Sequence, residues 1–584
     1  MRWTVEDFKG LKSAQLDLTP GRLTVLTGVN SSGKSSLLQS VLLAAQSLYH
    51  EGPVVLNGPL VRLGDAHDLV RDGSASSSVK FTLDVSTDGA DDHPGELFFT
   101  AHLELVPTED KTGLHAKKLT MEETAGEDPL LLDRQNSIQT DVELVTQYLP
   151  SVEGDQLLHL KSLLGTTNRS LRTYVVMNGF VPTSVVQLDR PEAIEAKYKR
   201  ALSDMLAVSS TRNSRSQTGI IRGRALFAPV VREFTRLLWE QRSSVSGRMG
   251  DLVEGLSGAR SGNPYTFELV WKDLSPEERT QLIDLAAQTR MKRPYVRVPV
   301  SSHSLQSGYG VNGLLERNLV ERLGVSLSAL VALSETLDSL ASRVEYLGPL
   351  RDEPRVVWSQ WNELSRGLPV GTRGEYSATV LSRSAKRVIR YRSPEGEELN
   401  EPLARAVDKW LKYLDIGDAV SAKGLGKLGV GMQISVEGVN RDLTAVGVGV
   451  SQALPLVVAL LAVEENSLFI VEQPELHLHP AVQGRLADFL LSSRPGVGVL
   501  VETHSEALVT RLRRRVAEGV RPNQIAIVFT ERESGGAVTR ELALSEYGDL
   551  SEWPTGFLST SEEDVRAILK ANLPKVGQGA KRGS

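Results

Sequence analysis

The stretch GVNSSGKSS, residues 28–36, decides the fold of this chain. An apolar run with β character, residues 23–27, precedes it, and a helical pattern follows it. Glycines let the backbone curl around phosphate oxygens, while the loop amides, the helix N-terminus and a lysine supply positive charge. The serine after that lysine is suited to ligate Mg²⁺. We therefore expect a phosphate-binding loop made of Gly28, Asn30, Ser31, Ser32, Gly33, Lys34, Ser35 and Ser36.

Two further apolar runs end in polar side chains that fit the same site. Residues 468–471, LFIV, are followed by Glu472. Residues 497–501 are followed by Glu502, Thr503 and then His504. Because ligands gather at the carboxyl ends of strands in an α/β sheet, these residues should meet the phosphate loop in one crevice. We expect Glu472 to pair with Ser35 as a second magnesium ligand. His504 is placed to sense the γ-phosphate, although a lone histidine after a strand is more often structural.

A glycine-rich segment opens an apolar helical pattern over residues 444–463. Backbone amides and hydroxyls at such a helix N-terminus can bind a phosphate that the first loop leaves uncovered. The candidate residues are Gly447, Gly449, Ser451 and Gln452.

Composition indicates a multidomain globular protein. The chain has 584 residues, 40% hydrophobic and 24% charged, which suits two to four domains. A net charge of −6 gives no global attraction to nucleic acid or anionic membranes, so any such binding must be local. Cysteine is absent, which excludes disulfides and thiolate zinc sites and fits a reducing cytoplasm. The strongly apolar stretch 453–463 is too short to span a bilayer, so we expect a cytoplasmic protein with no membrane role.

The order of these features resembles ABC-type ATPases of the chromosome-maintenance, Rad50 and RecF kind. That resemblance implies an α/β fold: an ABC-type ATPase head, with a mixed sheet around a P-loop core, assembled from N- and C-terminal lobes. It also implies ATP and Mg²⁺ as cofactors. Such ATPases clamp ATP between two subunits, so Ser451 and its neighbours would close on the nucleotide of a second copy. The chain would then be a homodimer or a higher homo-oligomer.

Closer matches point to bacterial defence ATPases. The opening FKGLKSAQLDLTPGRLTVLTGVNSSGKSSLLQSVLLAAQ resembles OLD-type and related proteins, as do LNGPLVRLG at 56–64, YLGPLRDEP at 346–354, EQPELHLHP and ETHSEAL. YGDLSEWPTGF, residues 547–557, resembles the tail of AAA-family ATPases with an uncharacterised C-terminal domain. Genes of that group commonly lie beside a nuclease or another effector. The resemblance therefore implies a separate effector as partner.

Three departures from the family pattern bear on catalysis. The family has an Asp-Glu pair after the second strand, magnesium ligand and then base, whereas this chain has Glu472 and Gln473. An amide orients water without accepting its proton, which slows hydrolysis if the base contributes its usual ~10²–10⁴-fold. Glu475 is a possible substitute base. The signature helix reads VGVGVSQ, so Ser451 or the amides near Gly449 would make the contact, and no glutamine fills the loop after the first helix.

His477 and His479, in ELHLHP, suggest two readings. Two histidines at i and i+2 could face one side of an extended segment and hold a metal. The resemblance favours instead a structural or dimer contact, because this segment corresponds to the ABC loop that crosses the dimer axis. His479 could also help position water.

The sequence of the middle of the chain indicates an insertion between the two lobes. It shows no sustained heptad repeat of the kind that forms a coiled coil. Amphipathic patterns at 141–164, 193–206, 229–256 and 313–347 indicate helices. We expect lobe I at 1–105, a mainly helical insertion at 106–340, lobe II at 341–535, and a C-terminal segment with a disordered tail at 536–584. Residues 190–248 contain twelve Lys or Arg against five Asp or Glu, which suggests DNA or RNA contact or simply a solvated helix face. The arginines at 511 and 513–515 raise the same question.

The family resemblance implies two functions, and Gln473 suggests a third. The first is an ATP-driven dimerisation switch that regulates a separate nuclease or effector in anti-phage defence. The second is an ATP-dependent DNA clamp of the RecF kind in repair or chromosome maintenance. The third is a nucleotide-binding scaffold with little hydrolysis, which Gln473 would favour.

Overall fold

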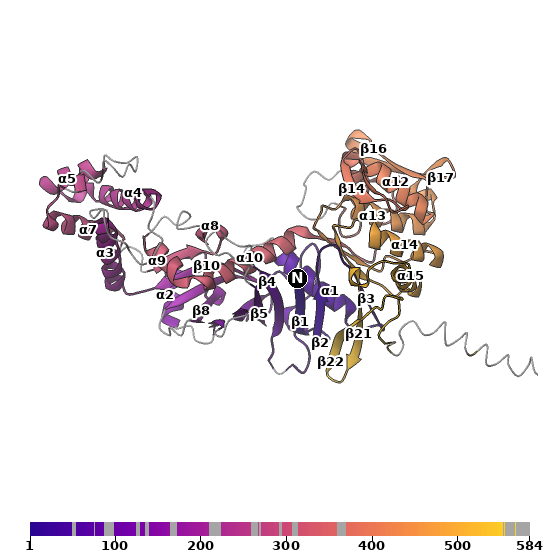
Figure 1. Ribbon diagram of the computed structural model, residues 1–584, viewed down its shortest axis with the longest axis horizontal. Helices are drawn as coiled ribbons and strands as arrows, with labels where there is room; N and C mark the ends of the chain where they lie inside the picture. Colours follow the sequence, from indigo (N-terminus) through magenta and orange to yellow (C-terminus); the bar gives the residue numbers. More distant parts are fainter. Residues whose placement is uncertain are drawn as a thin grey trace, which may run out of the picture.

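The structure is a computed structural model that describes most of the chain. The described residues are 1–48, 54–74, 76–86, 98–123, 129–134, 139–163, 172–208, 224–257, 267, 270–271, 273–290, 295–305, 314–358, 370–552, 554 and 567. A head formed by residues 1–48, 344–358 and 370–552 continues into an arm formed by the described residues between 114 and 323 (Figure 1). One sheet of 16 strands runs through both parts.

Five parallel strands form the centre of the head. They lie in the order β21 (Ile525–Glu533), β3 (Leu23–Gly28), β20 (Gly498–Glu502), β19 (Leu468–Glu472) and β12 (Val344–Leu347). The three inner strands are buried along nearly their whole length, as their uninterrupted apolar sequences require. Their carboxyl ends therefore meet at one edge of the sheet.

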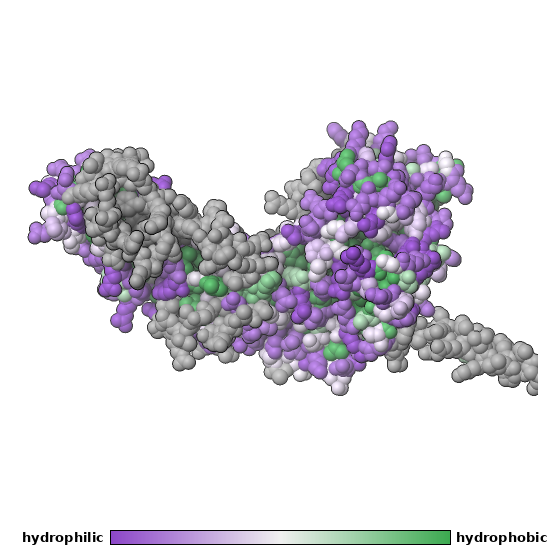
Figure 2. Space-filling view, viewed as in Figure 1, coloured by the Kyte–Doolittle hydropathy of each residue, from purple (hydrophilic) through white to green (hydrophobic). Residues whose placement is uncertain are grey.

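Helices cover this centre. α1 (Lys34–Ser47) follows β3, while α13 (Val448–Ala462), α14 (Pro480–Ser492) and α15 (Glu506–Ala517) belong to the C-terminal half. α12 (Leu403–Leu414) packs on α13 and α14, and its buried Trp410 contacts Phe489 edge to face. The remaining elements here are α11 (Ser377–Ser384), β13 (Val357–Trp358), β14 (Val388–Arg392), β15 (Glu398–Pro402), β16 (Ala419–Gly424), β17 (Val430–Val436) and β18 (Val439–Asp442). The face of the head around α12, α14 and α15 is mostly hydrophilic (Figure 2).

The sheet becomes antiparallel toward the arm. β22 (Gly536–Leu542) forms a hairpin with β21 and runs parallel to β2 (Leu11–Asp17). From β2 the order continues through β1 (Arg2–Phe8), β4 (Val79–Ser86), β5 (Phe98–Pro107), β6 (Leu114–Glu123), β7 (Leu130–Asp133), β8 (Leu157–Ser162), β9 (Thr173–Asn178), β10 (Val181–Leu188) and β11 (Tyr295–Pro299). Buried and partly exposed residues alternate along β4, which is typical of a sheet with one face on a core.

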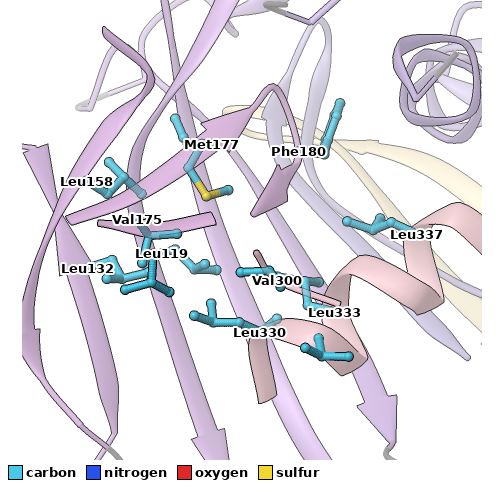
Figure 3. Close-up of a cluster of buried hydrophobic side chains, with 14 of the residues drawn as sticks. Leu119, Leu132, Leu158, Val175, Met177, Phe180, Val300, Leu330, Leu333 and Leu337 are labelled. Carbon is cyan, nitrogen blue, oxygen red and sulfur yellow. The ribbon is translucent and has the colours of Figure 1, made fainter. Parts of the chain in front are cut away.

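α10 (Val325–Arg343) closes the core of the antiparallel part. Its residues Leu330, Leu333 and Leu337 lie against the sheet that carries Val175 and Met177 (Figure 3). All five side chains are at most 1% exposed. Among the described residues no single helix is long and apolar enough to cross a membrane; α10 meets that test only together with α9 (Leu314–Leu323), as a pair bent by 86°.

The middle region contains the expected helices and unexpected strands. The patterns at 193–206 and 229–256 are confirmed as helical by α3 (Pro191–Val208), α4 (Arg224–Glu240) and α5 (Arg248–Ser257). The pattern at 313–347 is helical in α9 and α10, but its last four residues form β12. α7 (Pro276–Arg290) packs on α3 and α4, and this group forms the end of the arm (Figure 1).

Among the described residues the insertion at 106–340 holds more helix than strand, as expected, but residues 114–188 differ, because most of the described residues there are strand. The pattern at 141–164 begins as α2 (Gln139–Tyr148) but ends as β8. Short apolar runs fit a strand and a buried helix equally well, and here pairing with the existing sheet edge decides for strand.

Candidate functional site

The phosphate-binding loop lies between β3 and α1, as the sequence predicted. Gly28 has a φ of 145°, and a Cβ there would lie 2.3 Å from the backbone oxygen of Thr530. Gly33 caps α1 with a φ of 93°. Both positions therefore require glycine. Asn30 and Ser31 are exposed and Ser36 is half-buried at the start of α1; Ser32 is buried, and its hydroxyl has no hydrogen-bond partner among the described residues.

Lys34 is folded back over the loop. Its Nζ donates to the carbonyl oxygens of Gly28 at 3.1 Å and Val29 at 2.8 Å. Burial lowers the pKa of the Lys34 ammonium, and the negative charge of Glu502 opposes that shift. The cation is thus held at the mouth of the loop, where the family pattern puts it against phosphate.

Ser35 contacts a different acid from the one predicted. Its hydroxyl donates to the two carboxylate oxygens of Glu502, each at 3.1 Å. The roles of Ser35 and Glu472 as magnesium ligands remain predictions, and the contact of Ser35 with Glu502 has a structural reason. The reason is strand order: β20, which ends in Glu502, lies directly beside β3, while β19, which ends in Glu472, lies one strand further away.

Glu472 is held from its other side. The hydroxyl of Tyr346 donates to its Oε1 at 2.6 Å, and the Arg351 guanidinium donates to its backbone oxygen at 3.3 and 3.4 Å. Glu472 and Glu502 are register partners on adjacent parallel strands, so their side chains lie on the same face of the sheet. Burial raises the pKa of both acids, and the charge of Glu472 raises that of Glu502 further. Tyr346 and Arg351 were not predicted as site residues, although the motif YLGPLRDEP contains both.

The three predicted catalytic residues lie together at this edge. Gln473 has a φ of 43°, and its N–H donates to the backbone oxygen of Glu502 at 2.7 Å. Glu475 is buried, and its Oε1 accepts the N–H of His504 at 2.8 Å. Partial burial and the neighbouring Lys34 lower the pKa of His504. Their catalytic roles remain predictions.

The predicted signature segment opens α13, with Gly447 as its N-cap. A Cβ on Gly449 would lie 2.9 Å from the backbone oxygen of His477, so the helix start packs closely on the loop after β19. The Ser451 hydroxyl is buried and donates to the oxygen of Val448 at 2.9 Å. Gln452 is half-buried. The N–H groups of Val450 and Ser451 donate to the backbone oxygen of Gly447, which leaves the amides of Val448 and Gly449 as the candidates to meet a phosphate.

His477 and His479 are exposed. Nδ1 of His479 accepts the N–H of Ala481 at 3.3 Å and so caps α14. In the part of the chain that the structure describes, no three His, Cys, Asp or Glu residues are grouped to hold a metal.

The arginines of α15 have partners within the chain. Asp488, 5% exposed, accepts hydrogen bonds from Arg511, Arg515 and Tyr413. Arg513 donates to the oxygen of Gly548, and Arg514 pairs with Glu518. This arrangement favours a structural role for these side chains.

A basic groove lies in the arm. It has a volume of about 400 Å³ and is lined partly by Lys197 and Arg200 of α3 and Arg322 of α9. Lys197 pairs with Asp189, which also lines the groove. Burial lowers the pKa of Arg322, and Asp189 opposes the shift.

Two families match parts of this chain. The family described as "AAA domain, putative AbiEii toxin, Type IV TA system" matches residues 330–510, and the family described as "Protein of unknown function (DUF3696)" matches residues 520–568. The first match includes α13, Glu472 and His504. The chain therefore contains an ATPase domain of the ABC/AAA kind followed by an uncharacterised C-terminal segment.

The fold also matches solved structures weakly. The Smc head domain with an extended coiled coil, bound to the C-terminal domain of ScpA and derived from Pyrococcus furiosus, is 10% identical, with 97% of this chain and 98% of that chain covered and a TM-score of 0.32. The SMC head domain from Thermotoga maritima is 9% identical, with coverages of 93% and 98% and a TM-score of 0.31. A comparison with curated proteins gives no match.

Proposed function

We propose that this protein binds and hydrolyses ATP at the site formed by the loop at 28–36 and the ends of β19 and β20, and that ATP closes a dimer of heads. The observation that carries the proposal is the convergence of Lys34, Ser35, Glu472 and Glu502 at one sheet edge. The loop amides and Lys34 would hold the phosphates.

The donor set fits Mg²⁺. Ser35 and the two carboxylates supply oxygen ligands, which this ion prefers, and two adjacent buried acids favour a divalent cation beside them. Gln473 or Glu475 would orient the attacking water, and His504 would contact the γ-phosphate. Since most catalysis in phosphoryl transfer comes from positioning and charge stabilisation, the chain can hydrolyse ATP slowly without a glutamate at position 473.

A second copy would complete the site. α13 begins with exposed residues at Gly447 and Val448, the latter 56% exposed, and its first-turn amides would bind the phosphate of the partner's nucleotide. In this proposal, residues 1–105 and 341–535 are the two lobes of the nucleotide-binding head, and residues 106–340 are an insertion between them.

The closed dimer would regulate a separate nuclease or effector in anti-phage defence. Support comes from the matched family, whose description names a putative toxin of a type IV toxin–antitoxin system. The test is affinity purification of the tagged chain with its genomic neighbours, with and without ATP. A neighbour that is captured in only one nucleotide state supports the proposal, and a set of captured proteins unchanged by ATP contradicts it.

The basic groove gives the DNA-clamp alternative a specific observation. Arg200 and Arg322 line it, with one acid, Asp189, in the same lining. ATP-dependent binding of duplex or gapped DNA that weakens in Arg200→Ala/Arg322→Ala would favour the clamp.

Single-turnover ATP cleavage distinguishes a working ATPase from a nucleotide-binding scaffold that hydrolyses little ATP. A working ATPase cleaves ATP faster than the Lys34→Ala variant, and Glu475→Gln tests the substitute base. If the wild type and Glu475→Gln cleave ATP at equal rates near background, the result would favour the scaffold.

A further inference from the structure

We propose that the basic groove of the arm binds a nucleoside phosphate, at a site separate from the phosphate-binding loop of the head. The groove lies between α3 and α9, over β10 and β11, which are the last two strands of the sheet (Figure 1). Its volume of about 400 Å³ is that of a small-molecule pocket. This inference goes beyond the proposed ATPase function and does not depend on it.

The floor of the groove carries one amide on an otherwise apolar sheet face. Gln187 of β10 and Val296 of β11 are register partners, and both line the groove. Gln187 shares its face of the sheet with the fully buried Val185, two positions earlier. Gln187 is only 8% exposed, yet its side-chain amide has no hydrogen-bond partner among the described residues. Since buried amides are normally hydrogen-bonded, this one is suited to bond a ligand in the groove.

Two arginines on opposite walls of the groove make no ion pair with a described residue. They are Arg200 of α3 and Arg322 of α9, and the two helices pack on each other. The third cation, Lys197, is paired with Asp189. Partial burial lowers the pKa of the Arg322 guanidinium, and the charge of Asp189 offsets only part of that shift. An anion held between the helices would stabilise both arginines, and phosphate matches the planar donor fork of arginine.

The rest of the lining suits the base and sugar of a nucleoside. Ile194 and Leu319 supply apolar surface for the face of a base. The side-chain amides of Gln187 and Asn318 can donate to and accept from its polar edge or the sugar hydroxyls. A nucleoside phosphate combines an anion, a flat apolar face and polar edges in one molecule of this size.

Duplex DNA fits the groove less well. Binding to a nucleic-acid backbone needs several free cations along a track. Next to the groove, however, Lys199 of α3 is already paired with Glu195 and Asp284. Asp189 also puts a negative charge into the lining itself. The distribution of charge therefore favours one small anion over a duplex.

The test is isothermal titration of the full chain with AMP, GMP, CMP, UMP and orthophosphate. Excess Mg²⁺ and a non-hydrolysable ATP analogue fill the proposed site of the head. We expect saturable binding of at least one nucleotide, tighter than that of orthophosphate. Arg200→Gln/Arg322→Gln should weaken it by about 10–100-fold, because charge-assisted hydrogen bonds to phosphate are lost. Gln187→Leu keeps the side-chain volume and should weaken it by about 3–10-fold at an unchanged melting temperature.

Arg236→Gln on α4 is the matched control, because Arg236 pairs with Glu240 and does not line the groove. Its affinity for the nucleotide should equal that of the wild type. A wild type that binds none of the four nucleotides overturns the proposal, as does binding that is unchanged in the folded double arginine variant and in Gln187→Leu. A DNA duplex that binds through Arg200 and Arg322 and is not displaced by any nucleotide would also overturn it. Failure of the head to bind the ATP analogue would contradict the proposed function and leave this result unaffected.

Discussion

The Ser35 hydroxyl and the Glu502 carboxylate are hydrogen-bonded although they lie 467 positions apart in the chain. This bond joins the helix that follows the phosphate loop to the end of a strand from the C-terminal half. The two halves of the chain thus form one site, and each can be probed separately.

Lys34→Ala should weaken ATP binding by about 10–100-fold, because a charged hydrogen-bond donor to phosphate contributes about 1.5–3 kcal/mol. Isothermal titration with a non-hydrolysable analogue measures the affinity. Lys12→Ala, on β2 and half-exposed, is the matched control and should bind normally. Equal affinities for the two variants would refute the role of Lys34.

Gly28→Ala should destabilise the head by about 3 kcal/mol, since the substitution combines an unfavourable φ with a clash against the Thr530 backbone. Urea unfolding followed by circular dichroism gives the free energy of unfolding. Gly424→Ala, at the exposed end of β16, places its Cβ more than 4 Å from other described atoms and should be nearly neutral. A stable Gly28→Ala protein would mean that the loop is built differently.

Asp488→Asn should lower the free energy of unfolding by about 3 kcal/mol, because it leaves Arg511 and Arg515 without their buried counterion. Burial alone would raise the pKa of Asp488, but its bonds to Arg515, Arg511 and Tyr413 lower it below the usual value. The stabilisation is therefore present above about pH 4 and is lost as pH falls through the lowered pKa. Unfolding curves at pH 7 and pH 3 measure the difference, which should shrink at the lower pH.

Glu345→Gln should stabilise the protein at alkaline pH. Burial, and then the charge of Glu464, raise the pKa of Glu345 to about 9. The unfolded chain releases this proton near pH 4.5, so the wild type loses stability as pH rises from there toward 9. At pH 8 the variant should be more stable by about 1 kcal/mol or more, and near pH 5 by much less. The measurement is the free energy of unfolding of both proteins from pH 5 to pH 8. A difference between them that does not change with pH would show that ionisation of Glu345 does not destabilise the fold.

The head was largely predictable from the sequence, because buried parallel strands are uninterrupted apolar runs and their polar ends mark the site. The stretch GVNSSGKSS predicted the loop between β3 and α1. The runs at 468–471 and 497–501 predicted that Glu472 and His504 lie at the same edge of the sheet as this loop. The choice of Glu502 as the partner of Ser35 depends on which strand lies next to β3, and a linear pattern does not contain that order.

The arm was less predictable. Strands β6–β11 extend an existing sheet edge, so each is stabilised by pairing with its neighbours in the sheet, and a linear pattern does not show that pairing. Tyr346 and Arg351 were missed as site residues because each acts on Glu472, 126 and 121 residues away, through contacts that only the fold creates.

Dimer closure around ATP is tested most directly by mixing two defective variants. Lys34→Ala removes the phosphate cation, and Val448→Glu puts a negative charge at the exposed start of α13. Each variant alone should remain monomeric with ATP and Mg²⁺, because both sites of its dimer are damaged. In the mixture, one site combines Lys34 from one copy with Val448 from the other, so light scattering should detect ATP-dependent dimers. A mixture that stays monomeric under conditions in which the wild type dimerises, or a wild type that does not dimerise with ATP, would contradict the account.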